Sequence, residues 1–445
     1  MTTPPYIPRT GRVPGLFAAV GCLMIVAAAG IGDAHAWGGP HVTITRAALA
    51  TLPESQSRQF GDEWSQLGSL HCLIPDRVYA DKEIATYAMM DSRPGKTYLV
   101  NLHLPATQPE NFEVLQYFME KGVAAMRAGD LKDAARYAGT LAHVLEDWSC
   151  PAHCVAGDNM FTLFKQFLPP PDSWRYALLH SPVESGGLEV EIDGRRPARL
   201  GCSVNEAAFV LLQRANDGII AARAQVIPII QGLYGNESNR VTKAQTTAAV
   251  FGAGLVADAL HTLFSLGEMS AEAPPVPMDL SACIPLEATN LAFPQSAFFS
   301  RPYWGHAQRG VILRDGTNAV PLALMIEDAG KTSKREFAAG MGTGTRSSLT
   351  YFVPQDLYDQ FTVWVGLQAG IGTTGDVLFS VLGNGAELGS ARVTGTQPAR
   401  RLAFGISGVT NLQLVATSAG GDGKGNYAVW AEPRLIKSGA PLTRK

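Results

Sequence analysis

The spacing of apolar residues changes once along this chain of 445 residues, at a proline-rich stretch that begins after residue 270. Before it, apolar residues recur every three or four positions, which is typical of helices. The stretch itself, residues 271–290, contains four prolines and predicts a stiff linker. After it, short runs alternate apolar and polar residues between glycine-rich turns, which is typical of strands. We therefore expect a multidomain protein, with an all-α domain over residues 37–270 and an all-β, jelly-roll-like sandwich over residues 291–438.

Local patterns within each domain predict the individual elements. Helices are expected at residues 41–51, as two helices within 111–148 that separate near Gly129, and at residues 203–232 and 241–267. A β-hairpin is expected over residues 188–200, turning at Asp193 and Gly194. Strands of the sandwich are expected at residues 361–367, 377–381, 401–406 and 412–416, with a turn at residues 383–385.

The first 36 residues have the features of a secretory signal peptide. Arg9 and Arg12 supply positive charge, and an apolar run follows over roughly residues 16–31. The sequence Ala-His-Ala at residues 34–36 then has the small-x-small form of a cleavage site. Because the apolar run is short for the roughly 20 residues that cross a bilayer, we expect removal rather than anchoring. The mature protein is then secreted, extracellular or periplasmic, and begins at Trp37.

The net charge bears on whether the protein binds nucleic acid, and the cysteines bear on whether it forms disulfides. The formal net charge is −3, which offers no electrostatic basis for a stable nucleic-acid complex. Removal of the signal leaves five of the six cysteines, an odd number. Cys150 and Cys154 bracket His153, and in a secreted protein we expect disulfides that brace this loop ahead of zinc ligation by the thiols. The sequence leaves their pairing open.

The middle of the helical domain carries a His-x3-Asp-x5-His motif. His143 and Asp147 are four residues apart and therefore share one helix face. Pro151 ends the helix, so that His153 returns toward the same point. Imidazole and carboxylate groups are zinc ligands, although histidines on an amphipathic helix are also common without a metal. Six of the nine histidines lie between residues 37 and 190: His41, His71, His103, His143, His153 and His180. This concentration beside carboxylates suggests several metal ions, whereas His261 lies on a late apolar helix and is expected in the core.

These motifs together resemble the zinc-dependent phospholipase C family and the related fungal-type zinc single-strand nucleases. The similar stretches are Trp-Gly-Gly-Pro-His at residues 37–41, Pro-Asp at 75–76, the His143, Asp147 and His153 motif, and His-Ser-Pro-Val-Glu at 180–184. The resemblance covers roughly residues 37–269. It implies an all-helical domain with three Zn²⁺ ions in one cleft.

The resemblance also implies a ligand set for each ion. The amine of Trp37 is free to bind only after the signal is removed, which would tie activity to export. The first ion would be held by the amine and carbonyl of Trp37 with His41 and Asp147, the second by Asp147, Asp76, His103 and His143, and the third by His153, His180 and Glu184.

Three of these positions have competitors in the sequence. His103 lies further from Asp76 than the family leads us to expect, and Pro182 is tolerated only in the first turn of a helix. The competitors are His71 for His103, Asp81 for Asp76, and Asp158 or Asp172 for Glu184.

The expected chemistry follows from the ions. Zinc with an open coordination position lowers the pKa of bound water to about 7, which provides hydroxide at neutral pH. Asp76, close to the metals, is the expected catalytic base as well as a ligand. The resemblance implies a phosphoric diester hydrolase of phospholipase C type, acting on phospholipids. The alternatives are a single-strand nuclease or 3′-nucleotidase, and a non-catalytic surface binder in which zinc only stabilises the fold.

The C-terminal domain resembles the NPCBM family of carbohydrate-binding modules over roughly residues 296–436. The resemblance implies that the domain targets a glycan or a cell-envelope surface. Tyr303, Trp304 and Trp430 are candidates for stacking on sugars, although Trp364 and Trp430 are more typical of a sandwich core. The similar stretches are residues 340–342, 348–351, 361–366, 375–381, 408–415 and 426–431.

Overall fold

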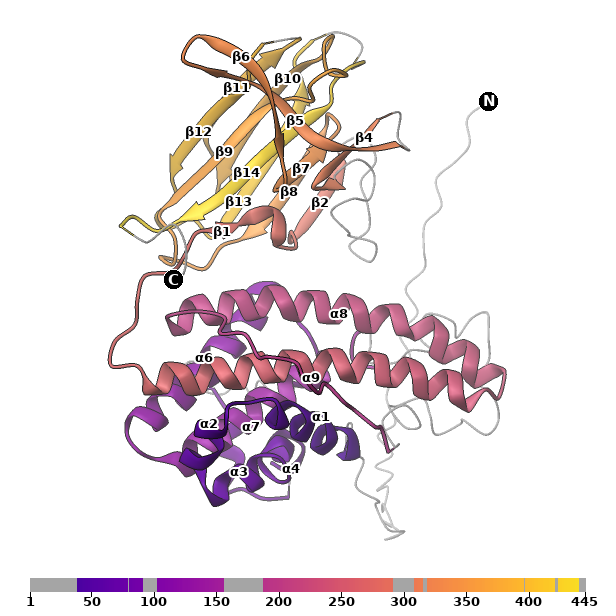
Figure 1. The fold of residues 1–445 in the computed structure, drawn as a ribbon, viewed down its shortest axis with the longest axis vertical. Helices are drawn as coiled ribbons and strands as arrows, with labels where there is room; N and C mark the ends of the chain where they lie inside the picture. The colour runs from indigo at the N-terminus through magenta and orange to yellow at the C-terminus, as the bar shows by residue number, and fades with distance from the viewer. Residues whose placement is uncertain are drawn as a thin grey trace, which may run out of the picture. The chain divides into compact units, whose positions relative to one another are not determined.

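Helices occupy the first part of the described chain and strands the second (Figure 1). In this computed structural model, the described helices end at residue 268 except for the short η5 (Leu280–Ala282), and every described strand follows residue 277. The predicted order, an all-α region followed by an all-β region, is confirmed. The structure describes residues 38–78, 80–90, 102–155, 187–290, 308–314, 318–395, 397–420 and 423–439.

The helical region is built around two long helices that run side by side, α8 and α9 (Figure 1). α9 is long and apolar enough to cross a bilayer, but 78% of its most apolar window is buried inside the protein, as in the core of a folded domain. The five helices longer than two turns are α1 (Gly38–Ala50), α6 (Gln108–Arg127), α7 (Leu131–Asp147), α8 (Val204–Tyr234) and α9 (Ser238–Glu268). The shorter ones are α2 (Glu54–Phe60), α3 (Asp62–Leu67), η1 (His71–Leu73), α4 (Ile74–Arg77) and η2 (Ala85–Ala88).

α7 lies at the centre of this region, in contact with α1, α6, α9 and η1. It starts where the sequence predicts a break: Gly129 has a φ of +78°, and the Asp130 side chain accepts a hydrogen bond from the Asp133 amide. At Gly139 a Cβ atom would lie 2.4 Å from the carbonyl carbon of His71, so that α7 and η1 approach closely. All eight residues of α7 from residue 140 to 147 are buried, including polar ones. A helix end buried on every side must satisfy its polar side chains internally.

Residues 187–200 do not form the predicted hairpin. The turn is present at Asp193 and Gly194, where Gly194 has a φ of +75°. No strand is assigned on either side of it, because the backbone amides find other partners. Ala198 donates to Asp258 Oδ1 at 2.7 Å, and Leu200 donates to Thr262 Oγ1 at 3.0 Å, both on α9. Side chains of a helix thus replace the second strand.

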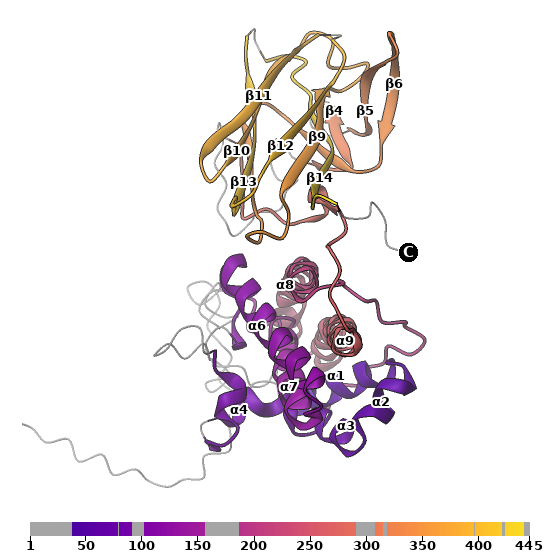
Figure 2. The ribbon, with the colours of Figure 1, turned by 90° about the vertical axis from the view of Figure 1, so that its left-hand side faces the viewer.

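The β region consists of two larger antiparallel sheets and one three-stranded sheet. One has the order β12-β9-β14-β7-β3, with β1 also paired to β14, and the second has the order β11-β10-β13-β8-β2. The third has the order β4-β5-β6. Figure 2 shows β10, β11 and β13 in one layer and β9, β12 and β14 in the other. The strands are β1 (Met278–Asp279), β2 (Glu287–Asn290), β3 (Gln308–Arg309), β4 (Val311–Arg314), β5 (Asn318–Asp328), β6 (Lys331–Phe337), β7 (Gly340–Thr343), β8 (Ser347–Phe352), β9 (Gln360–Leu367), β10 (Asp376–Gly383), β11 (Ala386–Thr394), β12 (Arg400–Gly405), β13 (Asn411–Ser418) and β14 (Ala428–Ile436).

The core of the sandwich lies between the two larger sheets. Phe379 of β10 and Trp430 of β14 meet edge to face, with ring centroids 5.1 Å apart. Trp430 is 1% exposed, so it fills the core and is not available to stack on a sugar. Tyr303 and Trp304 lie outside the described residues. Within the expected linker, β1 pairs with β14 and β2 pairs with β8, so that the second half of this stretch belongs to the sandwich.

The cysteines do not form the expected bridges. No disulfide joins any two of the five described cysteines. The Cys154 thiol donates a hydrogen bond to the carbonyl of Trp148 at 3.1 Å, which directs it into the protein. The loop is closed instead by the Cys154 amide, which donates to the carbonyl of Cys150 at 3.2 Å.

Candidate metal centre

The buried end of α7 supplies the first part of a cluster of metal-ligand side chains. His143 and Asp147 are one turn apart, and His143 Nε2 lies 3.2 Å from Asp147 Oδ2. The helix ends after Asp147, and the turn of residues 151–154 returns the chain. His153 Nε2 then lies 3.5 Å from Asp147 Oδ1. The three residues of the sequence motif therefore converge.

α1 adds a third histidine next to Asp147. His41 lies in the first turn of α1, and its Nε2 is 3.4 Å from Asp147 Oδ1. The rings of His41 and His143 stack with centroids 4.0 Å apart. The two oxygens of Asp147 thus face different partners. Oδ1 is near His41 and His153, and Oδ2 is near His143 and His103, whose Nδ1 is 2.7 Å away.

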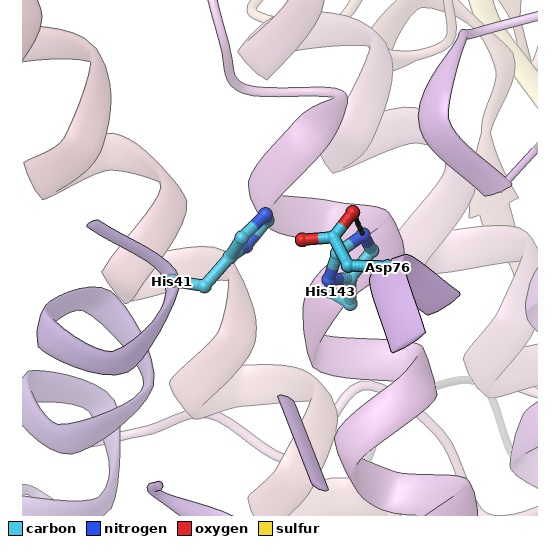
Figure 3. Close-up of side chains that lie close together, drawn as sticks. All are labelled: His41, Asp76 and His143. Atoms are coloured by element: carbon cyan, nitrogen blue, oxygen red, sulfur yellow. Dashed lines mark ion pairs between the residues drawn. The ribbon is translucent and has the colours of Figure 1, made fainter. Parts of the chain in front are cut away.

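α4 brings a second carboxylate to the same place. Asp76 Oδ1 lies 3.8 Å from His143 Nε2 and 4.0 Å from His103 Nδ1. Figure 3 shows His41, Asp76 and His143 pointing toward one another. In two groups, His41 with Asp76 and His143, and His103 with His143 and Asp147, the possible ligand atoms all lie within 4.8 Å of one another. Each group could hold a metal ion.

Burial leaves several of these ligand atoms without hydrogen-bond partners. The side chains of His41, His143 and Asp147 are 0% exposed, and that of Asp76 is 6% exposed. Among the described residues, His41 Nε2, Asp76 Oδ2 and Asp147 Oδ1 have no hydrogen-bond partner. Leaving a buried polar atom unsatisfied costs about 1–3 kcal/mol. A bound cation removes this cost, so the donor set fits a metal site chemically and sterically.

Two further contacts orient the histidines. Glu146 Oε2 lies 2.6 Å from His41 Nδ1, and Glu146 Oε1 accepts from Thr45 Oγ1 at 2.5 Å. The carbonyl of Cys72 lies 2.8 Å from His143 Nδ1. In both rings Nδ1 is occupied and Nε2 faces the cluster, which is how second-shell groups prepare histidine ligands. Glu146 was not among the residues expected at the site from the sequence. Its signal in the sequence is an acidic residue between apolar ones, beside the His143 and Asp147 motif.

The charges of the cluster support one another. Burial works against protonation of His41, but Asp147 and Glu146 outweigh it and raise the pKa of His41 well above its usual value. Burial alone would raise the pKa of Asp147. The nearby His153, His143 and His41 reverse this and hold the pKa of Asp147 well below its usual value. The pKa shift favours the ionised form of Asp147, which is the form that can bind a cation.

The competing residues have other partners. His71 Nε2 lies 3.1 Å from Glu63 Oε2, and burial lowers the pKa of His71. Asp81 is exposed, and its Oδ1 accepts from the amide of Glu83 at 2.9 Å. His261, which was expected in the core, is only half-buried, and its Nδ1 lies 3.3 Å from the side-chain oxygen of Gln56. The remaining predicted ligands and alternatives, Trp37, His180, Glu184, Asp158 and Asp172, lie outside the described residues.

Comparison with known proteins found a family model that matches the β region and solved structures similar to parts of the chain. No curated protein matches the chain. Three solved structures illustrate the likeness. A CBM51-2 module with INT domains of ZmpB from Clostridium perfringens, in complex with GlcNAc, is 22% identical with a TM-score of 0.30, and the match covers 37% of this chain and 32% of that chain. A CBM51 from GH95 of the same organism, in complex with methyl-galactose, is 21% identical with a TM-score of 0.30, covering 36% and 100%.

The third solved structure extends over most of the chain. It is alpha-toxin of Clostridium perfringens, 11% identical with a TM-score of 0.30, and the match covers 91% of this chain and 99% of that chain. The family comparison is confined to the sandwich, which is less than half of the chain. Residues 299–436 match the model of the NPCBM/NEW2 domain, which confirms the resemblance found for the C-terminal domain.

Proposed function

We propose that the helical domain is a secreted, zinc-dependent phosphoric diester hydrolase of phospholipase C type. The observation that carries the proposal is the buried cluster of four histidines and two aspartates, drawn from separate segments of the chain. Structural polar networks normally satisfy their atoms internally, whereas this one leaves Nε2 of His41 and oxygens of Asp76 and Asp147 without partners in the described residues. The order and spacing of the motifs, which resemble zinc-dependent phospholipases C, support the same assignment.

In this proposal Asp147 is the bridge between two ions. Its two oxygens already face different histidines, which supports the role. Trp37, His41 and Asp147 would hold one ion, and Asp76, His103, His143 and Asp147 a second. The third would be held by His153, His180 and Glu184.

In this proposal, residues of the chain would accept the proton of the attacking water and keep bulk water away from the ligands. Bound zinc would supply a water molecule with a pKa near 7 and positive charge opposite the phosphate. Asp76 would take the proton of that water, because its Oδ2 has no hydrogen-bond partner among the described residues. The burial of His41, His143 and Asp147 keeps bulk water away from the ligands. His103, with 21% of its side chain exposed, marks the side on which the cluster meets solvent.

Metal analysis of the exported protein, with N-terminal sequencing, tests the proposal directly. We expect Trp37 as the first residue and close to three zinc ions per chain. Hydrolysis should be measured on a short-chain phosphatidylcholine and on single-stranded DNA, with 1,10-phenanthroline and Asp147→Asn as controls. Cleavage of the lipid supports the phospholipase assignment, and cleavage of DNA alone supports the nuclease. Bound zinc without turnover of either substrate supports the non-catalytic surface binder, and absence of any transition metal overturns all three.

We also propose that the sandwich binds a glycan or cell-envelope surface and so delivers the hydrolase to its substrate. The match of residues 299–436 to the NPCBM/NEW2 domain supports this role. A glycan array probed with the full chain, with and without free competing sugar, should show selective and competable binding. Uniform background on the array would count against it.

A further inference from the structure

A cavity of about 530 Å³ lies between the start of α6 and one face of α8. From α8 it is lined by Asn216, Ile219, Ile220 and Arg223, whose spacing of three, four and seven residues places them on one side of the helix. The rest of the lining comes from residues 105–109 and Asn111, at the start of α6, and from residues 284–287. The volume is within the range of about 300–1,000 Å³ that is usual for small-molecule sites.

The cavity adjoins the metal-ligand cluster at two points. Pro105, in its wall, follows His103 by two residues and therefore lies within about 7 Å of it along the chain. Arg223 Nε donates to the carbonyl oxygen of Cys154 at 2.6 Å, and Cys154 directly follows His153. The side chain of His103 is 21% exposed, compared with 2% for His153, so the cluster opens beside His103.

Two polar side-chain atoms in the wall of the cavity have no hydrogen-bond partner among the described residues. Asn216 is 8% exposed, and its Nδ2 has no hydrogen-bond partner among the described residues. Gln108 Oε1 is likewise a buried atom without a hydrogen-bond partner among the described residues. Buried amides are nearly always satisfied, so this donor and this acceptor are suited to a ligand.

The charge in the cavity favours an anion. No carboxylate of the described chain is paired with Arg223, which adds a positive charge to the lining. The first turn of α6 adds none, because it carries its own acidic residue, Glu110, which accepts from the amide and hydroxyl of Thr107. Glu287 is the one acidic residue in the lining. A phosphate ester meets these conditions, because its oxygens accept hydrogen bonds from a guanidinium group.

We propose that this cavity is the substrate-binding site of the metal cluster, in which Arg223 contacts an oxygen of a phosphodiester and Asn216 Nδ2 donates to the alcohol portion of the same molecule. The assignment rests on the proposed function, because the cluster is taken to supply the reaction. Arg223 and Asn216 are then binding residues and take no part in the proton transfers at Asp76.

Kinetics of two variants separate a binding role from a structural one. In Arg223→Gln we expect KM to rise at least tenfold, with kcat within about twofold and the zinc content unchanged. In Asn216→Leu we expect a rise of about threefold to tenfold, because an uncharged hydrogen bond is lost. Arg240→Gln is the matched control, since Arg240 is an exposed arginine of α9 paired with Glu237, and it should leave both constants unchanged. Short-chain phosphatidylcholine and phosphatidylglycerol should both be tested, because Glu287 would favour the lipid that carries a positive charge.

Two results would overturn the assignment. One is a wild-type KM in both variants, and the other is a joint loss of zinc and kcat in Arg223→Gln, which would mean that Arg223 only supports the loop after His153. If the wild type hydrolyses no lipid, the proposed function fails. Calorimetry with a non-hydrolysable phosphonate analogue of phosphatidylcholine then tests separately whether the cavity binds such a ligand. Binding that Arg223→Gln weakens tenfold supports the cavity, and absence of binding to the wild type rejects it.

Discussion

At the scale of single residues, Glu146 shows how a buried carboxylate prepares a neighbouring ligand. It is fully buried, accepts from Thr45 and contacts Nδ1 of His41, which leaves Nε2 of His41 to face Asp147. The amide of a glutamine offers only one oxygen to these two donors. In Glu146→Gln we therefore expect zinc affinity to fall about 10- to 100-fold at the ion held by His41, as measured by competition with a chelator.

Glu63→Gln is the matched control for that experiment. Glu63 also contacts a histidine, His71, at 3.1 Å, but outside the cluster. The zinc affinity of Glu63→Gln should equal that of the wild type, and far-ultraviolet circular dichroism should show that both variants are folded. If Glu146→Gln and Glu63→Gln have the same zinc affinity, Glu146 does not orient His41 for zinc binding.

The thiols provide a second prediction at this scale. Burial raises the pKa of Cys72 and Cys283 far above the usual value and that of Cys154 to about 12, and Cys150 is also buried. Cys202 is only half-buried. A thiol reagent should therefore modify one cysteine per native mature chain, and Cys202→Ser should abolish that reaction. In denaturant all five cysteines should react, and a smaller number would reveal disulfides.

At the scale of elements, the segment of residues 187–202 depends on α9 for its position. Asp258, 1% exposed, accepts two hydrogen bonds from Arg195 and one from the amide of Ala198, and it pairs with Arg214. In Asp258→Asn we expect the free energy of unfolding of the helical domain to fall by about 1–3 kcal/mol, because the charge that satisfies these donors is lost. Urea denaturation followed by circular dichroism at a helical wavelength measures the change.

Asp193→Asn is the control for this effect, since Asp193 is exposed at the turn of the same segment. It should change the free energy of unfolding by less than about 0.5 kcal/mol. If Asp258→Asn also changes the free energy of unfolding by less than about 0.5 kcal/mol, Asp258 does not stabilise the segment. The buried side chains of Leu188, Val190 and Ile192 would then hold it in place.

At the scale of the whole molecule, export and metal binding are coupled in the proposed function. In the proposed site, the first ion is held by the amine and carbonyl of Trp37 together with Asp147 and with His41, which lies buried in the first turn of α1. A mature chain that retains Ala36 replaces this amine by an amide nitrogen, which is a poor zinc ligand. We expect that chain to hold about one zinc ion fewer in metal analysis and to lose hydrolysis.

Trp37→Phe, in a correctly cleaved chain, is the control for the extended one. It keeps the amine and the carbonyl, and its zinc content should match the wild type. The same zinc content in the chain that retains Ala36 would show that the terminal amine is not a ligand.

Local patterns were enough to predict most of the fold and the centre of the site. The break near Gly129, the long helices, and the turn at Asn384 and Gly385, which have φ values of 51° and 83°, depend on neighbours in sequence. The pairing of His143 with Asp147 is equally local, because a spacing of four residues places both side chains on one face of any helix.

Long-range contacts decided the rest, because a hydrogen-bonding group takes whichever partner the folded chain brings near. Glu146 meets His41 across 105 residues, and no short-range pattern specifies that pair. The amides of Ala198 and Leu200 bond to side chains of α9, so an alternating apolar segment that reads as a hairpin did not become one. By itself the sequence determined which segments are helical or extended, apart from residues 188–200, and it offered a set of candidate metal ligands. Only the tertiary structure decided which of those residues share a buried centre, because that depends on how distant helices pack.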